Sequence, residues 1–478
     1  MRKTKIVATL GPSTDDPDVL SAMITSGLDV ARFNFSHGSH ESHKERVDKL
    51  RAACKKTGAT VAMLADTKGP EIRLGTFQCG KVELVAGNPF TLTTSEIPGD
   101  ATRASISYPD LPRELSPGSR ILLDDGLVEL LVESISGANI TTRIVTGGII
   151  SDRKSLNVPR VRLDIPYINA KDRSDLRFFV ESNFDIIAAS FVRSAEDIME
   201  MREELHRIDS NNKIRIIAKI ENAEGVSNAD SILSVSDGLM VARGDLGVEL
   251  EYEDLPIIQK TLIKKTLHQG KSVITATQML ESMIHNPRPT RAEASDVANA
   301  IYDGTSAIML SGETAAGKYP VESISAMTRI AERIERDIDY RQRLSRSEHK
   351  AETSITNAIS HATVTTAHDL NTAAILTVSM SGDTARNVSK FRPQCPIIAC
   401  TPDPVTMRQL KIAWGVVPLL SKEETDTTAM FNHAVEAALK GGYIKEGDLI
   451  VLTAGVPVGL SGTTNMLKVH IVGEKILV

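Results

Sequence analysis

Charged and polar side chains stand at the ends of short apolar runs, and their types are those of a reactive site. Glu221 and Asp245 close two such runs, Arg32 lies within a third, and Lys219 precedes Glu221 by two residues. Charges buried on apolar strands are costly unless they are paired or bound to a metal. One such charge is readily explained as a structural ion pair, but polar groups at the ends of six runs favour a shared site.

The two carboxylates suit a divalent cation. Glu221 and Asp245 offer hard oxygen ligands, and Mg²⁺ or Mn²⁺ often takes one or two carboxylates together with water and substrate phosphate. The same pair could instead act as the acid and base of a glycosidase. The surrounding cations favour a multiply anionic substrate over a neutral sugar, and they are Arg32, Arg73, Lys219 and Arg243.

Lys219 has two chemical interpretations. Because it lies two residues from Glu221, both side chains are expected on the same side of one strand. There the ammonium could neutralise a phosphoryl group in transfer, or the amine could form a Schiff base, as in barrel aldolases. The glycines that flank Asp245 permit close backbone approach, and a following helix N-terminus would offer amides to an anion.

The elements that must position these residues alternate between strand-like and helical patterns, which predicts a parallel α/β fold. The strand-like runs are 5–11, 30–36, 61–69, 186–192, 215–221, 238–247, 272–279 and 306–314. Eight parallel strands with crossover helices can close into a (β/α)8 TIM barrel, in which polar residues at the C-terminal strand ends are catalytic. An open doubly wound sheet is the alternative on strand count alone.

Two further units interrupt or follow this pattern. After Pro70 the chain shows β-branched runs broken by Gly, Pro, Asn and Asp, with no convincing helix. We predict an inserted small β-barrel, the lid, over residues 70–166. The barrel catalytic domain then comprises residues 1–69 and 167–340. A charged stretch near Arg341 marks the start of a C-terminal α/β three-layer regulatory domain, residues 341–478.

Composition limits the partners and the compartment. The net charge of -6 and the aromatic content of 4% argue against nucleic acid as a partner. No apolar stretch approaches the ~20 residues that a membrane helix needs. The four cysteines lack the C-x-x-C spacing of a zinc or redox motif, so we expect reduced thiols in a cytoplasmic protein.

Taken together, segments spread along the chain resemble pyruvate kinases of the bacterial type. They are ATLGPST, VARFNFSHG, DTKGPEIR, AKIENAEG, VARGDLGVE, TATQMLESM, PTRAEASDVANA and SGETA, followed near the C-terminus by VLTAGVPVG and GTTN. The resemblance implies a barrel with an inserted lid, a C-terminal regulatory domain and a homotetramer. It implies that phosphoenolpyruvate and ADP give pyruvate and ATP through an enolate of pyruvate.

The resemblance also implies roles at the substrate. Arg32 and Lys219 would hold the phosphoryl group, and Glu221 and Asp245 would ligate Mg²⁺ or Mn²⁺. The backbone at Gly244 and Asp245 and the hydroxyl of Thr277 would hold the substrate carboxylate. A threonine is too weak an acid to protonate the enolate alone, so Thr277 would relay a proton through water or orient the enolate.

A monovalent cation and a nucleotide complete the expected ligands. The resemblance implies that K⁺ is held by Asn34, Ser36, Asp66 and Thr67. Glu71 matches the form that needs K⁺, since a lysine at this place accompanies independence of K⁺. The expected contacts to ADP or ATP are Asn34, His37, Arg73 and Lys154, with Lys154 reaching down from the lid.

A hydroxyl-rich turn in the C-terminal domain suits an allosteric phosphate. Ser379, Ser381, Gly382 and Thr384 stand at a predicted strand-to-helix turn, where hydroxyls and amides can bind a phosphorylated effector. Asp383 would repel a phosphate, which argues against fructose 1,6-bisphosphate and leaves a sugar monophosphate or AMP as alternatives. The alternative is a helix N-cap cluster without a ligand.

Three functions compete at this stage. The first is a pyruvate kinase, and the second is a metal-dependent barrel aldolase that acts on pyruvate or phosphoenolpyruvate. The third is a catalytically silent metabolite sensor. Arg73 and Lys154 count against the aldolase, which needs no ADP site. The intact set of charged strand-end residues counts against the sensor.

Overall fold

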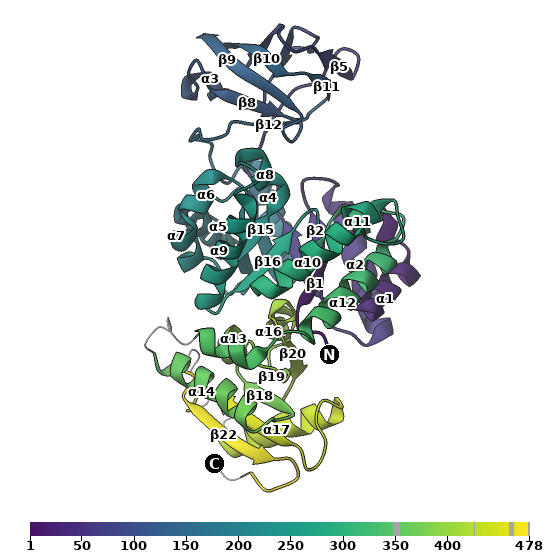
Figure 1. Cartoon of the computed structure of the whole chain (residues 1–478), viewed down its shortest axis with the longest axis vertical. Helices are drawn as coiled ribbons and strands as arrows, with labels where there is room; N and C mark the ends of the chain where they lie inside the picture. Colours follow the sequence, from purple (N-terminus) through teal and green to yellow (C-terminus); the bar gives the residue numbers. More distant parts are fainter. Residues whose placement is uncertain (348–353, 425, 458–462, 477–478) are drawn as a thin grey trace.

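The computed structural model of the chain describes residues 1–347, 354–424, 426–457 and 463–476. Three bodies lie one above another along the long axis of the molecule (Figure 1). The lid is at the top, the helix-ringed barrel is in the middle, and the C-terminal unit is at the bottom.

Eight parallel strands of the described chain form a closed barrel in the order β1-β17-β16-β15-β14-β13-β3-β2, which confirms the predicted TIM barrel and excludes the open sheet. The strands are β1 Lys5–Thr9, β2 Val30–Asn34, β3 Ala62–Asp66, β13 Ile186–Ala189, β14 Arg215–Ile220, β15 Gly238–Ala242, β16 Ser272–Ala276 and β17 Ala307–Leu310. Their side chains are almost all buried, as expected for parallel strands covered on both faces.

All eight strands end before the predicted runs do, and in two of these runs a helix begins. Strand β15 stops at Ala242, and helix α8 (Arg243–Glu249) begins at the next residue. Strand β17 stops at Leu310 and is followed by the short helix α11 (Gly312–Ala315). Asp245 therefore lies in the first turn of a helix rather than on a strand, a place that the helix dipole favours for a carboxylate.

A ring of helices covers the barrel. These helices are α1 Pro17–Ser26, α2 His40–Thr57, α4 Ala170–Glu181, α5 Ala195–Ile208, α6 Ala223–Ser227, α7 Ala229–Val235, α9 Leu255–His268, α10 Arg291–Asp303 and α12 Pro320–Glu335, with the short 3-10 turns η1 Pro12–Thr14 and η2 Glu281–Ile284. Helix α10 starts at a capping box of Thr290 and Glu293, which satisfies amides that have no partner within the helix. The apolar core lies between this ring and the strands, and Phe33 and Phe179 are fully buried in it.

Strands are the main regular elements of the lid, and they surround one apolar core that includes Phe90 and Leu130. A seven-stranded sheet has the order β4-β12-β8-β9-β10-β6-β7, and β11 pairs with β5. The bounds are β4 Ile72–Arg73, β5 Lys81–Leu84, β6 Pro89–Thr93, β7 Arg103–Ser105, β8 Arg120–Leu123, β9 Val128–Ser136, β10 Asn139–Thr146, β11 Gly148–Ser151 and β12 Ser155–Asn157. One short helix, α3 (Leu111–Glu114), was not predicted, and a proline in its first turn favours its start.

The C-terminal unit is a sheet with helices on both faces. Its described strands have the order β20-β19-β18-β21-β22, all parallel except β22. The elements are α13 Tyr340–Ser347, α14 Ile355–Asp369, β18 Ala374–Val378, α15 Asp383–Lys390, β19 Ile397–Thr401, α16 Pro404–Gln409, η4 Leu410–Ile412, β20 Val416–Leu420, α17 Thr427–Lys440, β21 Leu449–Ala454 and β22 Met466–Ile471. Helix α17 packs on one face, and α14 and α15 pack on the other. Residues 458–459 of the VLTAGVPVG segment and residue 462 of the GTTN segment lie outside the described residues.

None of the helices in the described chain combines the length and apolarity needed to cross a membrane.

Candidate active site

Asp66, at the end of β3, is the centre of the charged cluster on the barrel. Its two carboxylate oxygens pair with different cations, Oδ2 with Arg32 Nε at 2.6 Å and Oδ1 with Lys219 Nζ at 2.9 Å. Burial works to raise the pKa of Asp66, but Arg32 and Lys219 outweigh it and hold this pKa below its usual value. The carboxylate therefore stays ionised between two cations that come from two other strands.

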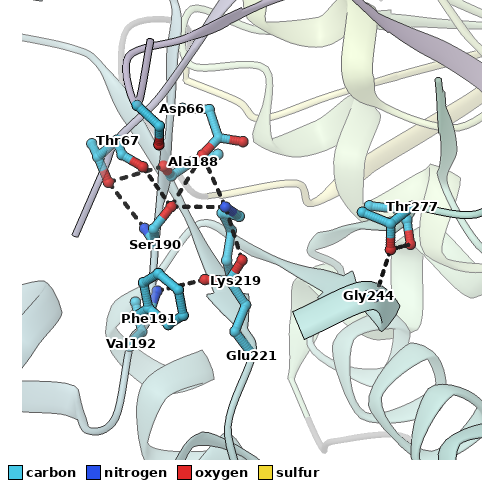
Figure 2. A network of polar contacts seen from close by, with 12 residues as sticks. Asp66, Thr67, Ala188, Ser190, Phe191, Val192, Lys219, Glu221, Gly244 and Thr277 are labelled. Carbon is cyan, nitrogen blue, oxygen red and sulfur yellow. Dashed lines mark hydrogen bonds and ion pairs between the residues drawn. The ribbon is translucent and has the colours of Figure 1, made fainter. Parts of the chain in front are cut away.

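Lys219 has three oxygen partners, as Figure 2 shows. Besides Asp66, its ammonium lies 2.9 Å from Glu221 Oε1 and 2.7 Å from Ser190 Oγ. Burial works to lower the pKa of Lys219, but Asp66 and Glu221 outweigh it and raise this pKa above its usual value. The side chain is thus a stable ammonium, whereas a Schiff base needs the neutral amine. The contacts support the phosphoryl interpretation of Lys219 over the aldolase interpretation.

Glu221 and Asp245 meet beside this lysine. Glu221 is buried, and its Oε2 accepts a hydrogen bond from the Phe191 amide at 2.6 Å. Burial and the neighbouring Asp245 raise the pKa of Glu221, although Lys219 works in the opposite direction. Asp245 is half-buried and lines a cavity of about 380 Å³ between barrel and lid. Two carboxylates that repel each other beside a cavity fit the ligand set of Mg²⁺ or Mn²⁺.

Thr277 lies in a strained turn after β16. Thr277 and the next residue, Gln278, have φ angles of 66° and 53°, in the left-handed region that side chains adopt only at a cost of roughly 1–3 kcal/mol each. The Thr277 hydroxyl accepts a hydrogen bond from the Gly244 amide at 2.7 Å and donates one to the Ala276 carbonyl at 2.6 Å. Gly244 and Thr277, both expected at the substrate carboxylate, are thus in direct contact with each other.

Arg243 holds that turn and does not join the cationic cluster. Its guanidinium donates to the Thr277 carbonyl at 2.7 Å and to both carboxylate oxygens of Asp296, on α10, at 2.8 and 2.7 Å. The expectation that Arg243 belongs to the substrate's cationic surroundings is therefore wrong in this structure. Its planar fork matches a carboxylate and a carbonyl at the same time, which favours a structural role.

The residues expected to hold K⁺ gather at the ends of β2 and β3. Asn34 is the register partner of Asp66, and its Oδ1 accepts a hydrogen bond from the Ser36 amide at 3.1 Å. Thr67 is buried, and its hydroxyl accepts from the Ser190 amide at 3.0 Å. The four residues expected to hold K⁺ thus lie at two neighbouring strand ends.

The residues expected at the nucleotide do not share contacts with one another. Arg73, on β4, pairs with Glu71 at 2.8 Å and lines a cavity of about 630 Å³ at the base of the lid together with Lys68 and Arg153. Lys154 pairs with Asp124 within the lid at 2.8 Å. Asn34, described above, does not line that cavity.

His37, the remaining nucleotide residue, is exposed in the loop between β2 and α2. Its carbonyl accepts a hydrogen bond from His43 Nε2 at 2.9 Å. The structure therefore places Arg73 at a basic cavity but does not bring His37 or Lys154 to it.

Ser190 was missed by the sequence analysis although it lies at the centre of the cluster. It follows β13 and is buried, with its hydroxyl 2.7 Å from Lys219 and 3.1 Å from Asp66 Oδ1. In the run IIAASFV a serine is simply a small residue among apolar neighbours. Its position at the end of a barrel strand was the signal that could have identified it.

Most polar groups of the turn expected to bind an effector phosphate form hydrogen bonds within the protein. Gly382 is the N-cap of α15 in a left-handed conformation, and its amide donates to Ser379 Oγ at 3.0 Å. The Ser381 hydroxyl donates to Asp383 at 2.6 Å, and Thr384 is buried with its hydroxyl 2.9 Å from Thr464 Oγ1. These hydroxyls fix the loop, although none caps α15 through its side chain.

Asp383, expected to repel a phosphate, is partly neutralised. Its carboxylate pairs with Arg386 at 2.6 Å. Burial works to raise the pKa of Asp383, but Arg386 outweighs it and lowers this pKa. The turn consequently presents less free negative charge than the sequence suggested.

Comparisons with known proteins agree with this geometry. The family model described as "Pyruvate kinase, barrel domain" matches residues 1–324, and "Pyruvate kinase, alpha/beta domain" matches residues 357–470. A pyruvate kinase of Geobacillus stearothermophilus is 50% identical over 475 residues, which cover 99% of this chain and 81% of that protein. A pyruvate kinase of Clostridium acetobutylicum is 47% identical, with 99% of this chain and 100% of that protein covered.

A solved structure supports the same relationship. The crystal structure of a pyruvate kinase from Cryptosporidium parvum superposes with a TM-score of 0.92 at 40% identity, covering 98% of this chain and 96% of that one. The barrel, the strand-end cluster and these matches lead to one conclusion: the chain belongs to the pyruvate kinase family of phosphotransferases.

Proposed function

We propose that the chain transfers the phosphoryl group of phosphoenolpyruvate to ADP, giving ATP and, through its enolate, pyruvate. The carrying observation is that Arg32 and Lys219 converge on one buried carboxylate, Asp66, beside Glu221 and Asp245. Phosphoryl transfer needs positioning and neutralisation of charge more than covalent chemistry, and this cluster provides both.

In the proposed mechanism the two cations hold the phosphoryl group. Arg32 presents a guanidinium whose Nη1 is also tied to Thr9 Oγ1 at 2.8 Å, so its direction is fixed. Lys219 presents a buried ammonium that stays charged because its pKa is raised. A preorganised cation in a water-poor site neutralises charge that develops in the transition state without further reorganisation.

Glu221 and Asp245 are the proposed ligands of Mg²⁺ or Mn²⁺, which pyruvate kinases in general require together with K⁺. A divalent cation supplies Lewis-acid polarisation of phosphoryl and enolate oxygens. The residues contribute a fixed geometry, since the Phe191 amide holds one oxygen of Glu221 and the first turn of α8 holds Asp245.

The carboxylate of the substrate is proposed to bind at the start of α8, at the backbone of Gly244 and Asp245, with the Thr277 hydroxyl next to it. The amides of a first helical turn have no partner within the helix and favour an anion. The Thr277 proton is directed to the Ala276 carbonyl, so this residue orients the enolate or passes a proton through water.

For the nucleotide we propose Asn34, His37, Arg73 and Lys154. The basic cavity beside Arg73 supports binding of phosphates at the base of the lid. Lys154 can serve only by leaving Asp124, so this proposal includes a movement of the lid or of that side chain.

K⁺ is proposed to bind at Asn34, Ser36, Asp66 and Thr67, with its requirement set by Glu71. The carboxylate of Glu71 lies at the junction of lid and barrel and lines both cavities there.

We expect Glu71→Lys to support turnover without K⁺, because an ammonium would supply the missing positive charge. Rates measured with K⁺ replaced by tetramethylammonium test this. Glu71→Gln is the control and should retain the K⁺ requirement, while unchanged K⁺ dependence in Glu71→Lys would contradict the role of residue 71.

An effector phosphate is proposed at Ser379, Ser381, Gly382 and Thr384. The neutralisation of Asp383 by Arg386 supports it, and the Ser381 carbonyl lies 3.5 Å from Arg215 at the start of β14, the strand that carries Lys219.

We expect AMP or a sugar monophosphate to lower the phosphoenolpyruvate concentration at half-saturation, and fructose 1,6-bisphosphate to have no effect. Titrating each compound against substrate saturation decides this. No shift with any monophosphate would favour an internally capped loop.

We also propose the domain boundaries, the oligomeric state and the location of the protein. We divide the chain into the barrel (1–69 and 167–340), the lid (70–166) and the C-terminal domain (341–478), supported by their separate apolar cores. A homotetramer is supported by exposed apolar residues on the edge strands of the C-terminal sheet, such as Leu420 and Ile471. The glycolytic reaction and four free cysteines support a cytoplasmic location.

One assay separates the proposed function from its rivals. Pyruvate formation from phosphoenolpyruvate is measured by coupling to a dehydrogenase, with ADP, Mg²⁺ and K⁺ each left out in turn. A pyruvate kinase requires ADP and releases ATP in equal amount. Pyruvate formed without ADP would indicate other barrel chemistry, and no turnover under any condition would indicate a silent sensor.

A further inference from the structure

Lys219 has no free hydrogen-bond donor in the resting site. An ammonium has three N–H groups, and three oxygen atoms lie within 2.9 Å of Lys219 Nζ. Two belong to the carboxylates of Asp66 and Glu221, and the third and closest belongs to the neutral hydroxyl of Ser190. The direction of each N–H is therefore fixed by a partner on a different strand end.

Ser190 is itself held so that its lone pair faces the lysine. Its single hydroxyl proton is within reach of the Thr67 carbonyl at 2.6 Å and of Asp66 Oδ1 at 3.1 Å. Its amide donates to Thr67 Oγ1 at 3.0 Å, and its carbonyl accepts from the Tyr167 hydroxyl at 3.1 Å. With 1% of its surface exposed, the side chain has no room to turn away.

The residue after Ser190 fixes Glu221, the second partner of the ammonium. Phe191 has a φ of 53°, a left-handed conformation that is costly for an aromatic residue. In this conformation its amide donates to Glu221 Oε2 at 2.6 Å, which leaves Oε1 for Lys219. Strain that aims a backbone amide at a site residue is typical of functional segments.

We propose that Ser190 is a positioning residue for phosphoryl transfer, whose hydroxyl sets the position of the Lys219 ammonium. This inference rests on the proposed role of Lys219 at the phosphoryl group. With three fixed partners the Nζ atom is held at one place, and with only Asp66 and Glu221 it can shift between two carboxylates. A smaller share of positions then places the positive charge against the transferring group, which lowers the rate of the chemical step more than it lowers binding.

The test compares two replacements that differ in volume, neither of which restores the strong hydrogen bond of the hydroxyl. Ser190→Ala removes the hydroxyl and leaves a small void, whereas Ser190→Cys fills the space with a weak acceptor. We expect both to lower kcat by roughly ten- to a hundredfold while KM for ADP stays within about twofold. Ser323→Ala is the matched control, because Ser323 is equally buried and makes one hydrogen bond, in α12. It should retain full kcat.

The outcomes are distinct. A kcat near the wild-type value in Ser190→Ala overturns the inference, and so does a loss in Ser190→Ala that Ser190→Cys restores, since that indicates packing. A parallel rise of KM for both substrates also overturns it, because general loosening affects all ligands. The variant Lys219→Met tests the proposed role of Lys219 separately. If Lys219→Met keeps its turnover, the proposed role of Lys219 is wrong. If Lys219→Met is inactive and Ser190→Ala is active, only the role of Ser190 is wrong.

Discussion

Replacing Lys219 by methionine is expected to lower kcat by about a thousandfold, since that is the upper range for removing one preorganised group that stabilises transition-state charge. Methionine keeps the length of the side chain and removes the ammonium that contacts Asp66, Glu221 and Ser190. The steady-state rate of pyruvate formation at saturating phosphoenolpyruvate, ADP, Mg²⁺ and K⁺ measures the loss.

The same variant leaves buried carboxylates with fewer partners. Asp66 keeps its ion pair with Arg32, but Glu221 loses its cation. An uncompensated buried charge costs about 3–5 kcal/mol, so we expect Glu221 to take up a proton and the melting temperature to fall modestly. Lys44→Met, at an exposed lysine on α2, is the control for a lost charge. A kcat of Lys219→Met within tenfold of the wild type would contradict the assignment.

Glu221→Gln is expected to weaken the apparent affinity for Mg²⁺ by at least about a hundredfold, because even residues outside the ligand shell change metal affinity by 10–100-fold. Glutamine keeps the shape and can still accept the hydrogen bond from the Phe191 amide, so the loss reflects the charge. Turnover should recover only in part at high Mg²⁺.

Two measurements check this prediction independently. Turnover is titrated with Mg²⁺, and Mn²⁺ binding is followed by electron paramagnetic resonance, which does not depend on activity. Glu204→Gln is the control, since Glu204 is also buried but pairs with Arg173 on the outer helices. Full turnover of Glu221→Gln at ordinary Mg²⁺ would refute the metal role.

The parts of the fold and site that follow local rules could be predicted from the sequence. The spacing of Lys219 and Glu221 placed both side chains on one side of a strand, and their charged atoms lie 2.9 Å apart. The polar ends of β2, β3 and β14 meet because parallel barrel strands all end at the same face. Strand number and order of the barrel also follow from alternation of strand-like and helical runs.

The parts that depend on tertiary contacts could not be predicted. The run 238–247 was predicted as one strand, yet a helix begins at Arg243, because the polar residues Arg243 to Asp245 were taken as a strand end and not as the start of a helix. The left-handed conformations of Phe191 and Thr277 are imposed by partners distant in sequence. A local pattern does not contain those partners, so neither the strained turns nor the role of Ser190 was apparent.

The ion-pair partners of the charged residues also could not be predicted from the sequence. Arg243 was expected among the cations around the substrate, but Asp296, 53 residues away in sequence, holds it at the Thr277 turn. Lys154 was expected to reach the nucleotide, but in this conformation it pairs with Asp124. Long cationic side chains can reach several anions, and the position of the lid decides which one is near.

The most direct test of the account is a crystal structure of the protein grown with Mn²⁺ and phosphoenolpyruvate, with the metal located by its anomalous scattering. We expect a Mn²⁺ peak in contact with the carboxylates of Glu221 and Asp245, with the phosphoryl group against Lys219 and Arg32. A Mn²⁺ peak away from both carboxylates, or a phosphoryl group with no contact to Lys219, would contradict it.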